Sequence, residues 1–169
     1  MAFVTPTNVT VGTVLTASRY NADVTDNMTE LAPFFSAWTS FTPTLTASSG
    51  GLNLGSTATQ TGAYLKVGRV MFWRAEWVAN GSGIAAGTGE YQFTIPGSFL
   101  AAAPTAANVG NGTVFGGSGN YSSCAARVSS TSVIRFYGAE TPTAYVGSGS
   151  FGAASGWFMR CSGIIETTT

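Results

Sequence analysis

The chain has 169 residues, of which only 8% are charged, and its seven basic residues balance its seven acidic ones. A chain with zero net charge lacks the excess of basic residues that is typical of nucleic-acid-binding proteins. The absence of histidine excludes Ser-His and Cys-His catalytic pairs. Apolar residues still make up 44% of the chain, enough for a buried core, and such sparse charge favours association with other subunits.

Neither export by a signal peptide nor insertion into a membrane is expected. No apolar stretch approaches the ~20 residues of a membrane-spanning helix. The first residues, Met1–Pro6, lack the basic and apolar regions of a signal peptide.

Residues 1–15 are rich in threonine and valine and are predicted to form an extended arm. A helix is predicted over Ala17–Leu31, because apolar residues recur there at helical spacings of three and four. Pro33 disfavours helical backbone in the residue before it and so ends the helix. The apolar positions of this helix are Ala17, Tyr20, Val24, Met28 and Leu31.

This predicted helix has too narrow an apolar stripe to be stable alone in water. It must pack on its own β-domain, on a second copy of the chain or on another docking partner. We therefore assign residues 1–36 to attachment or oligomerisation.

The clearest strand is Arg69–Ala79, where residues alternate between two largely apolar faces. One face, with Met71, Trp73 and Trp77, is predicted to lie in the core. The other face is expected to be covered by another subunit or by the helix, and Arg74 and Glu76 are expected to pair across or beside that interface. The predicted interface residues are Val70, Phe72, Arg74, Glu76 and Val78.

Further short strands follow, separated by glycine-rich and serine-rich turns. They are predicted at Phe41–Thr46, Tyr64–Val67, Glu90–Ile95, Thr113–Phe115, Tyr121–Val128, Val133–Tyr137, Thr143–Val146 and Trp157–Glu166. Turn signals every 8–12 residues are typical of sandwiches and barrels. The predicted fold is mainly β: an antiparallel, jelly-roll-like β-sandwich over residues 37–169, behind the arm and one short helix.

No residue pattern points to a catalytic, cofactor-binding or metal site. Gly147–Gly152 matches G-x-G-x-x-G, but no helix follows it and the acidic residue of the dinucleotide-binding unit is missing. No two carboxylates are predicted to face one cleft, as glycoside hydrolysis requires. Tyr137, Tyr145 and Phe151 could stack on sugars at a loop surface, but packing in the core or against their own loops is the use that we favour.

Cys124 and Cys161 each fall on the apolar side of a predicted strand. Buried free cysteine behaves as a small hydrophobic residue, and this is the interpretation we favour. A disulfide remains an alternative if the two strands are neighbours.

Two stretches carry a resemblance to a known family. Val11–Asn21 (VGTVLTASRYN), followed by Asp26, Asn27, Met28 and Leu31, resembles the N-terminal G-x-V-x-T-A-x-x-x-N…D-N-x-x-x-L segment of small structural proteins of tailed bacteriophages. Residues 38–47 (WTSFTPTLTA), 62–69 (GAYLKVGR) and 91–96 (YQFTIP) are similar to the β-domain of such appendage proteins.

The resemblance covers roughly residues 11–96 and implies a virion protein of the minor tail, tail-fibre, head-fibre or capsid-decoration type. It implies no enzyme activity, no cofactor and a homotrimer. Its partners would be copies of itself, capsid or tail proteins and a host-surface glycan. Together with the apolar stripe of the predicted helix, the resemblance predicts an attachment segment. This segment comprises Val11, Tyr20, Asn21, Val24, Met28 and Leu31.

A non-enzymatic virion appendage, docked by its N-terminal segment, is therefore the expected function. The alternative is a carbohydrate-binding or depolymerising module that uses the loops near Tyr137, Tyr145 and Phe151. An arm with a docking helix favours the first, and two facing carboxylates in a cleft would favour the second.

Overall fold

The computed structural model describes residues 16–32, 37–102, 107–116, 120–138 and 155–168. The chain divides into two compact units, Met1–Ala37 and Trp38–Thr169. The predicted arm over residues 1–15 and the predicted strand Thr143–Val146 lie outside the described residues. The attachment role assigned to residues 1–36 stays a prediction.

The first unit contains the predicted helix. It consists of α1 (Ala17–Tyr20), the π-helical segment η1 (Asn21–Thr25) and α2 (Asp26–Leu31), which follow one another without a break. The Tyr20 N–H donates to the Thr16 carbonyl at 2.9 Å, which closes the first turn. The helix predicted over 17–31 is confirmed, with a wider π-helical turn in its middle.

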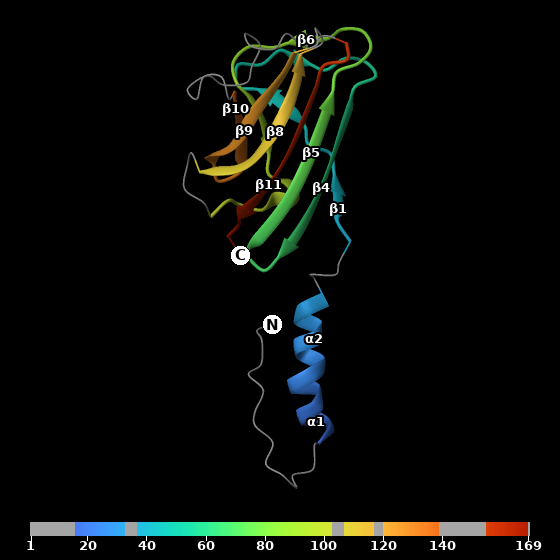
Figure 1. The fold of residues 1–169 in the computed structure, drawn as a ribbon, viewed down its shortest axis with the longest axis vertical. Coiled ribbons are helices and arrows are strands. Elements are labelled where there is room, and N and C mark those ends of the chain that lie inside the picture. The colour runs from blue at the N-terminus through green and yellow to red at the C-terminus, as the bar shows by residue number, and fades with distance from the viewer. Residues whose placement is uncertain (1–15, 33–36, 103–106, 117–119, 139–154, 169) are drawn as a thin grey trace. The chain divides into compact units, whose positions relative to one another are not determined.

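The second unit is built on one antiparallel sheet of nine strands in the order β1-β4-β5-β11-β8-β9-β10-β7-β2 (Figure 1). Its strands are β1 (Thr39–Phe41), β2 (Leu45–Ala47), β4 (Thr59–Val67), β5 (Val70–Val78), β7 (Tyr91–Thr94), β8 (Asn108–Gly116), β9 (Asn120–Ser130), β10 (Val133–Gly138) and β11 (Phe158–Glu166). Two short strands, β3 (Leu52–Asn53) and β6 (Ala85–Ala86), pair in a separate ribbon, and Pro96–Ser98 form the 3-10 turn η3.

The sheet curls until its two edges approach one another. Its edge strands β1 and β2 are separated by only three residues, which include Pro43. Four Cα–Cα steps span at most about 14 Å, whereas nine flat strands would be about 38 Å wide. The sheet is therefore a half-barrel.

The mainly β, antiparallel prediction is confirmed, but the two separate sheets of a sandwich are not clearly present. Hydrogen-bonded pairing continues through all nine strands, so the layers are parts of one curled sheet. The predicted strand Phe41–Thr46 is wrong for a related reason. Pro43 lies where the chain crosses from one sheet edge to the other, and the segment becomes the separate strands β1 and β2.

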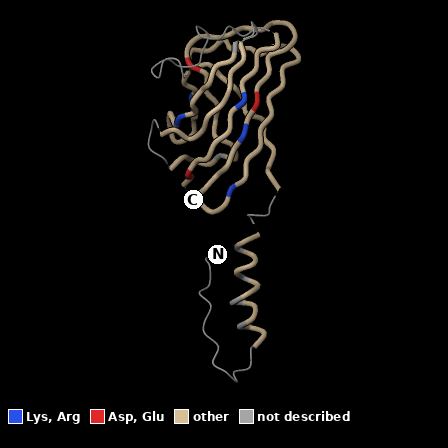
Figure 2. Tube along the Cα trace, viewed as in Figure 1, with Lys and Arg blue, Asp and Glu red and all other residues tan. Residues whose placement is uncertain are grey.

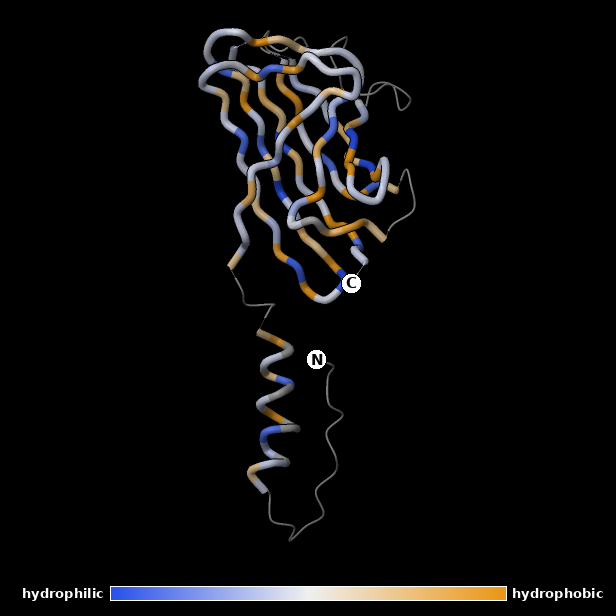
Figure 3. Tube along the Cα trace, turned by 180° about the vertical axis from the view of Figure 1, so that it is seen from behind, coloured by the Kyte–Doolittle hydropathy of each residue, from blue (hydrophilic) through white to orange (hydrophobic). Residues whose placement is uncertain are grey.

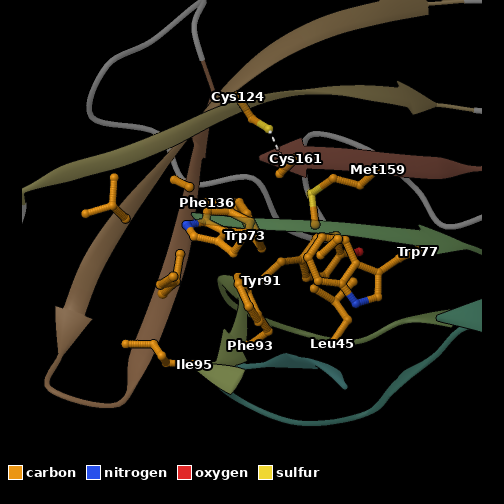
Figure 4. Packing of buried hydrophobic residues seen from close by; sticks show 14 of the residues in the cluster. Leu45, Trp73, Trp77, Tyr91, Phe93, Ile95, Cys124, Phe136, Met159 and Cys161 are labelled. Atoms are coloured by element: carbon orange, nitrogen blue, oxygen red, sulfur yellow. Dashed lines mark hydrogen bonds between the residues drawn. The ribbon is translucent and has the colours of Figure 1, made fainter. Parts of the chain in front are cut away.

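Aromatic side chains fill the interior of the curled sheet (Figure 4). The rings of Trp73 and Trp77 on β5 each lie 5.3 Å from the ring of Phe93 on β7, measured between centroids. Phe93 stacks on Phe136 of β10 at 5.7 Å. Because β5 and β7 are far apart in the strand order, these contacts show that the curl packs the sheet against itself. Met71, Trp73 and Trp77 are buried, as predicted.

Candidate functional site

The face of β5 that was predicted to be an interface points away from this core. Val70 is 39% exposed, Arg74 is exposed, and Phe72, Glu76 and Val78 are partly buried. Hydrophobic and hydrophilic positions alternate along the strands, as Figure 3 shows. The register of the strands next to β5 then determines which side chains share this outer face.

Two adjacent rows of polar side chains cross the outer face from strand to strand. In the first row, Thr61 lies opposite Glu76, Glu76 opposite Arg160, and Arg160 opposite Thr113. Directly opposite residues of antiparallel strands point to the same face, so these side chains form a continuous line.

The second row lies two residues further along each strand, about 7 Å away. It runs through Ser40, Ala63, Arg74, Ser162 and Asn111 on β1, β4, β5, β11 and β8. We call the two rows together the polar band.

A groove of about 610 Å³ lies over the polar band. The small side chains of Ala63 and Ser162 flank Arg74 on β4 and β11. Among the described residues that line it, Glu76 is the only carboxylate. The outward-facing lining residues are Ser40, Thr61, Ala63, Arg74, Glu76, Asn111, Thr113, Arg160 and Ser162.

The polar band holds an ion pair that sequence reasoning missed, while the pairing of Arg74 with Glu76 across or beside a subunit interface stays a prediction. Within the chain, Glu76 pairs with Arg160, whose Nη2 and Nε lie 2.7 and 2.8 Å from the same carboxylate oxygen. The guanidinium of Arg74 instead lies over the Trp38 ring, 5.1 Å from its centroid. Arg160 faces Glu76 directly across β5 and β11, whereas Arg74 and Glu76 are two residues apart on one strand.

An aromatic cluster borders the polar band toward the β8–β9 end of the strands. Phe115 lies 5.1 Å from Phe158 and 4.8 Å from Tyr121, and Tyr121 is 66% exposed. The guanidinium of Arg160 also lies over the Phe158 ring at 4.8 Å. Sequence reasoning missed this cluster because it could not show that β8 lies between β9 and β11.

On its other side the polar band is bordered by apolar side chains. Leu65, Phe72 and Ile164 lie opposite one another on β4, β5 and β11, and Ile164 is 54% exposed. Val67 and Val70 follow at the β4–β5 turn. We call these five residues the apolar end. Two of them, Val70 and Phe72, belong to the predicted interface.

The helix of the first unit carries an exposed apolar stripe. Tyr20 is 49%, Val24 40%, Met28 61% and Leu31 36% exposed. Asn21 is exposed on the same helix. The other predicted attachment residue, Val11, lies outside the described residues.

The three aromatic residues considered for sugar binding are not all described. Tyr137 lies on β10, where the guanidinium of Arg127 lies 4.7 Å from its ring centroid. Tyr145 and Phe151, together with the Gly147–Gly152 motif, lie outside the described residues. The use of these three residues in sugar binding therefore stays a prediction.

Cys124 and Cys161 are both buried and both free. Burial raises the pKa of the Cys161 thiol well above its usual value, and the hydrogen bond to Cys124 raises it further. Over the described residues, no three His, Cys, Asp or Glu side chains cluster as metal ligands, and no helix there is both long and apolar enough to cross a membrane.

Comparison with protein-family models, with curated proteins and with solved structures finds no match to this chain.

Proposed function

We propose that this protein is a non-enzymatic structural subunit of a virion. In this proposal it is a trimeric appendage, of a tail or a capsid, that docks through residues 1–36 and exposes its β-domain to the outside. The observation that carries the proposal is the exposed apolar stripe of the helix, at Tyr20, Val24, Met28 and Leu31.

The stripe supports docking because a helix of this length is marginal in water without a packing partner. Burying four apolar side chains against a partner removes them from water, at ~25 cal/mol for each Å² of apolar surface. A segment that orders on its partner recovers the entropic cost of ordering only in the assembled particle.

Self-association is supported by the apolar end of the outer face. Val70 and Ile164 are 39% and 54% exposed beside the partly buried Leu65 and Phe72. Contiguous exposed apolar side chains mark interaction surfaces, and few charges oppose the approach of a second copy. We therefore centre the proposed subunit interface on Val70 and Phe72, with Arg74, Glu76 and Val78 at its margin.

The docking proposal is tested by co-sedimentation with phage particles assembled without this subunit. The doubly substituted chain Val24→Asp, Met28→Asp should stay folded, because the β-domain is a separate compact unit, but should no longer sediment with the particles. Ser18→Asp, an exposed position outside the stripe, is the matched control and should bind like the unmodified chain. Equal sedimentation of all three chains would show that docking does not use the stripe.

A further inference from the structure

The polar band concentrates charge in a chain that has very little of it. Of fourteen charged residues in the sequence, three, Arg74, Glu76 and Arg160, line its groove. Figure 2 shows basic and acidic positions next to one another on the long strands. The sum of these three charges is +1, so the groove is suited to an anionic ligand.

Arg74 is the group that such a ligand would meet. Arg69, Arg135 and Arg160 each form an ion pair with a glutamate, whereas Arg74 forms none with the described residues and contacts the Trp38 ring. Stacking on an aromatic ring holds the guanidinium in place and leaves its N–H groups free. A planar guanidinium binds a carboxylate through two parallel hydrogen bonds.

Arg160 is also held in place, by Glu76 on one side and by the Phe158 ring on the other. Arg74 and Arg160 are diagonal neighbours on adjacent strands, so their Cβ atoms lie about 7 Å apart. Ser162, directly opposite Arg74, and Glu76, directly opposite Arg160, complete this group of four side chains. The charges of Arg160 and Glu76 offset one another in their ion pair, so Arg74 supplies the net positive charge that an anionic group would meet.

The remaining polar groups of the groove are neutral and unengaged. The side chains of Ser40, Thr61, Thr113, Ser162 and Asn111 are exposed and make no hydrogen bonds with the described residues. Hydroxyl and amide groups both donate and accept hydrogen bonds, which is what the hydroxyl groups of a sugar require. The groove is thus more suited to a polyhydroxylated ligand than to an apolar one.

The shape of the polar band indicates a chain-like ligand. It crosses five strands, from β1 to β8, and four strand spacings amount to about 19 Å. The exposed ring of Tyr121 stands beside it and offers a flat apolar surface on which a sugar ring can stack.

We propose that the polar band binds an acidic oligosaccharide, with a uronate carboxylate on Arg74 and sugar hydroxyl groups along the neutral side chains. This inference goes beyond the structural role proposed above and does not depend on it. Arg74 and Glu76 stand at the margin of the proposed subunit interface, so both proposals hold together when a second copy covers the apolar end and leaves the polar band open. The site itself requires no residue of that copy.

Titration calorimetry with the full-length chain tests the proposal. The probes are oligogalacturonate, oligomannuronate and hyaluronate fragments, each compared with neutral malto- and cello-oligosaccharides of similar length. At least one acidic fragment should bind, the neutral ones should bind at least tenfold more weakly, and affinity should fall as salt rises. Absence of binding by every acidic fragment, or equal binding of the neutral ones, would overturn the proposal.

Variants of two arginines that stack on aromatic rings identify the site. Arg74→Ala should weaken binding at least tenfold, and Arg74→Lys should restore it in part, because a lysine keeps the charge without the two-pronged geometry. Arg127→Ala removes another arginine that stacks on an aromatic ring but lies outside the groove, and it should bind normally. Equal affinities of the Arg74→Ala and Arg127→Ala variants would refute the assignment of the site. The solution mass of the same samples reports separately on self-association.

Discussion

The Sγ atoms of Cys124 and Cys161 lie 3.4 Å apart, although their strands β9 and β11 are not neighbours. Strand β8 runs between them, and its residue Gly112 is the register partner of both cysteines. With no side chain at position 112, the two thiols meet across the intervening strand on the inner side of the sheet (Figure 4).

We predict that the two thiols do not form an intramolecular disulfide in the folded protein. Two strand spacings separate their backbones by about 9.6 Å, whereas a disulfide needs Cα atoms about 4.4–6.8 Å apart. The raised pKa of Cys161 also lowers its reactive thiolate fraction. After exposure of the native protein to air, thiol titration in denaturant should still find both thiols. Their joint loss in a monomeric product would show that β8 can be displaced.

Gly112→Ala should lower the free energy of unfolding by about 1–3 kcal/mol. The added Cβ would lie 2.2 Å from the Arg160 carbonyl oxygen and 2.3 Å from the Cys161 Sγ, so backbone as well as side chain must shift. Urea unfolding measures the loss. Thr113→Ala, at the exposed neighbouring position, is the control and should change stability by less than about 0.5 kcal/mol. Similar values for both variants would mean that β8 and β11 separate easily.

Trp77→Ala should cost about 3–5 kcal/mol of stability. Its side chain is fully buried against Phe93 and Phe136, and its indole N–H donates to the Pro43 carbonyl, where the chain crosses between the sheet edges. Trp38→Ala, at a position 41% exposed, should cost much less in the same denaturant titration. A cost for Trp77→Ala as small as that of Trp38→Ala would contradict the described core.

Stability should decline at high pH because of Tyr91. Burial raises the pKa of its phenol from 10.0 to about 12, so the unfolded chain loses this proton at a lower pH than the folded one. The stabilisation is therefore complete below pH 10 and is lost as pH rises from about 10 to 12, at up to about 1.4 kcal/mol per pH unit. Tyr91→Phe should remove this contribution, although it also loses the hydrogen bond from the hydroxyl to the Ala86 carbonyl, 3.0 Å. If the free energies of unfolding of the unmodified chain and the Tyr91→Phe variant changed in parallel between pH 9 and 11, Tyr91 would not be the cause of the decline.

Local patterns in the sequence predicted much of the fold. The alternation over Arg69–Ala79 placed Met71, Trp73 and Trp77 inside, and the spacing over Ala17–Leu31 predicted the helix; both are confirmed. Alternation identifies the face of a strand but not its neighbour in the sheet. One curled sheet and two packed sheets both bury one face of each strand. They therefore give the same alternation of apolar and polar residues, and the sequence could not distinguish a half-barrel from a sandwich.

The candidate site was only half predictable for the same reason. Arg74 and Glu76 were found because they interrupt an apolar face of one strand. Arg160 lies 84 residues from Glu76 in the sequence, and only the pairing of β5 with β11 brings their side chains together. The polar band depends on the register between strands that are distant in the sequence. Composition and periodicity do not reveal that register.

The central claim, that this chain is a self-associating structural subunit, is tested most directly by its mass in solution. Sedimentation equilibrium of the full chain at micromolar concentration should give three times the chain mass of 17.3 kDa. Phe72→Asp, in the proposed interface, should give the monomer mass with the fold retained. A folded, unmodified chain that sediments as a monomer throughout this range would contradict the claim.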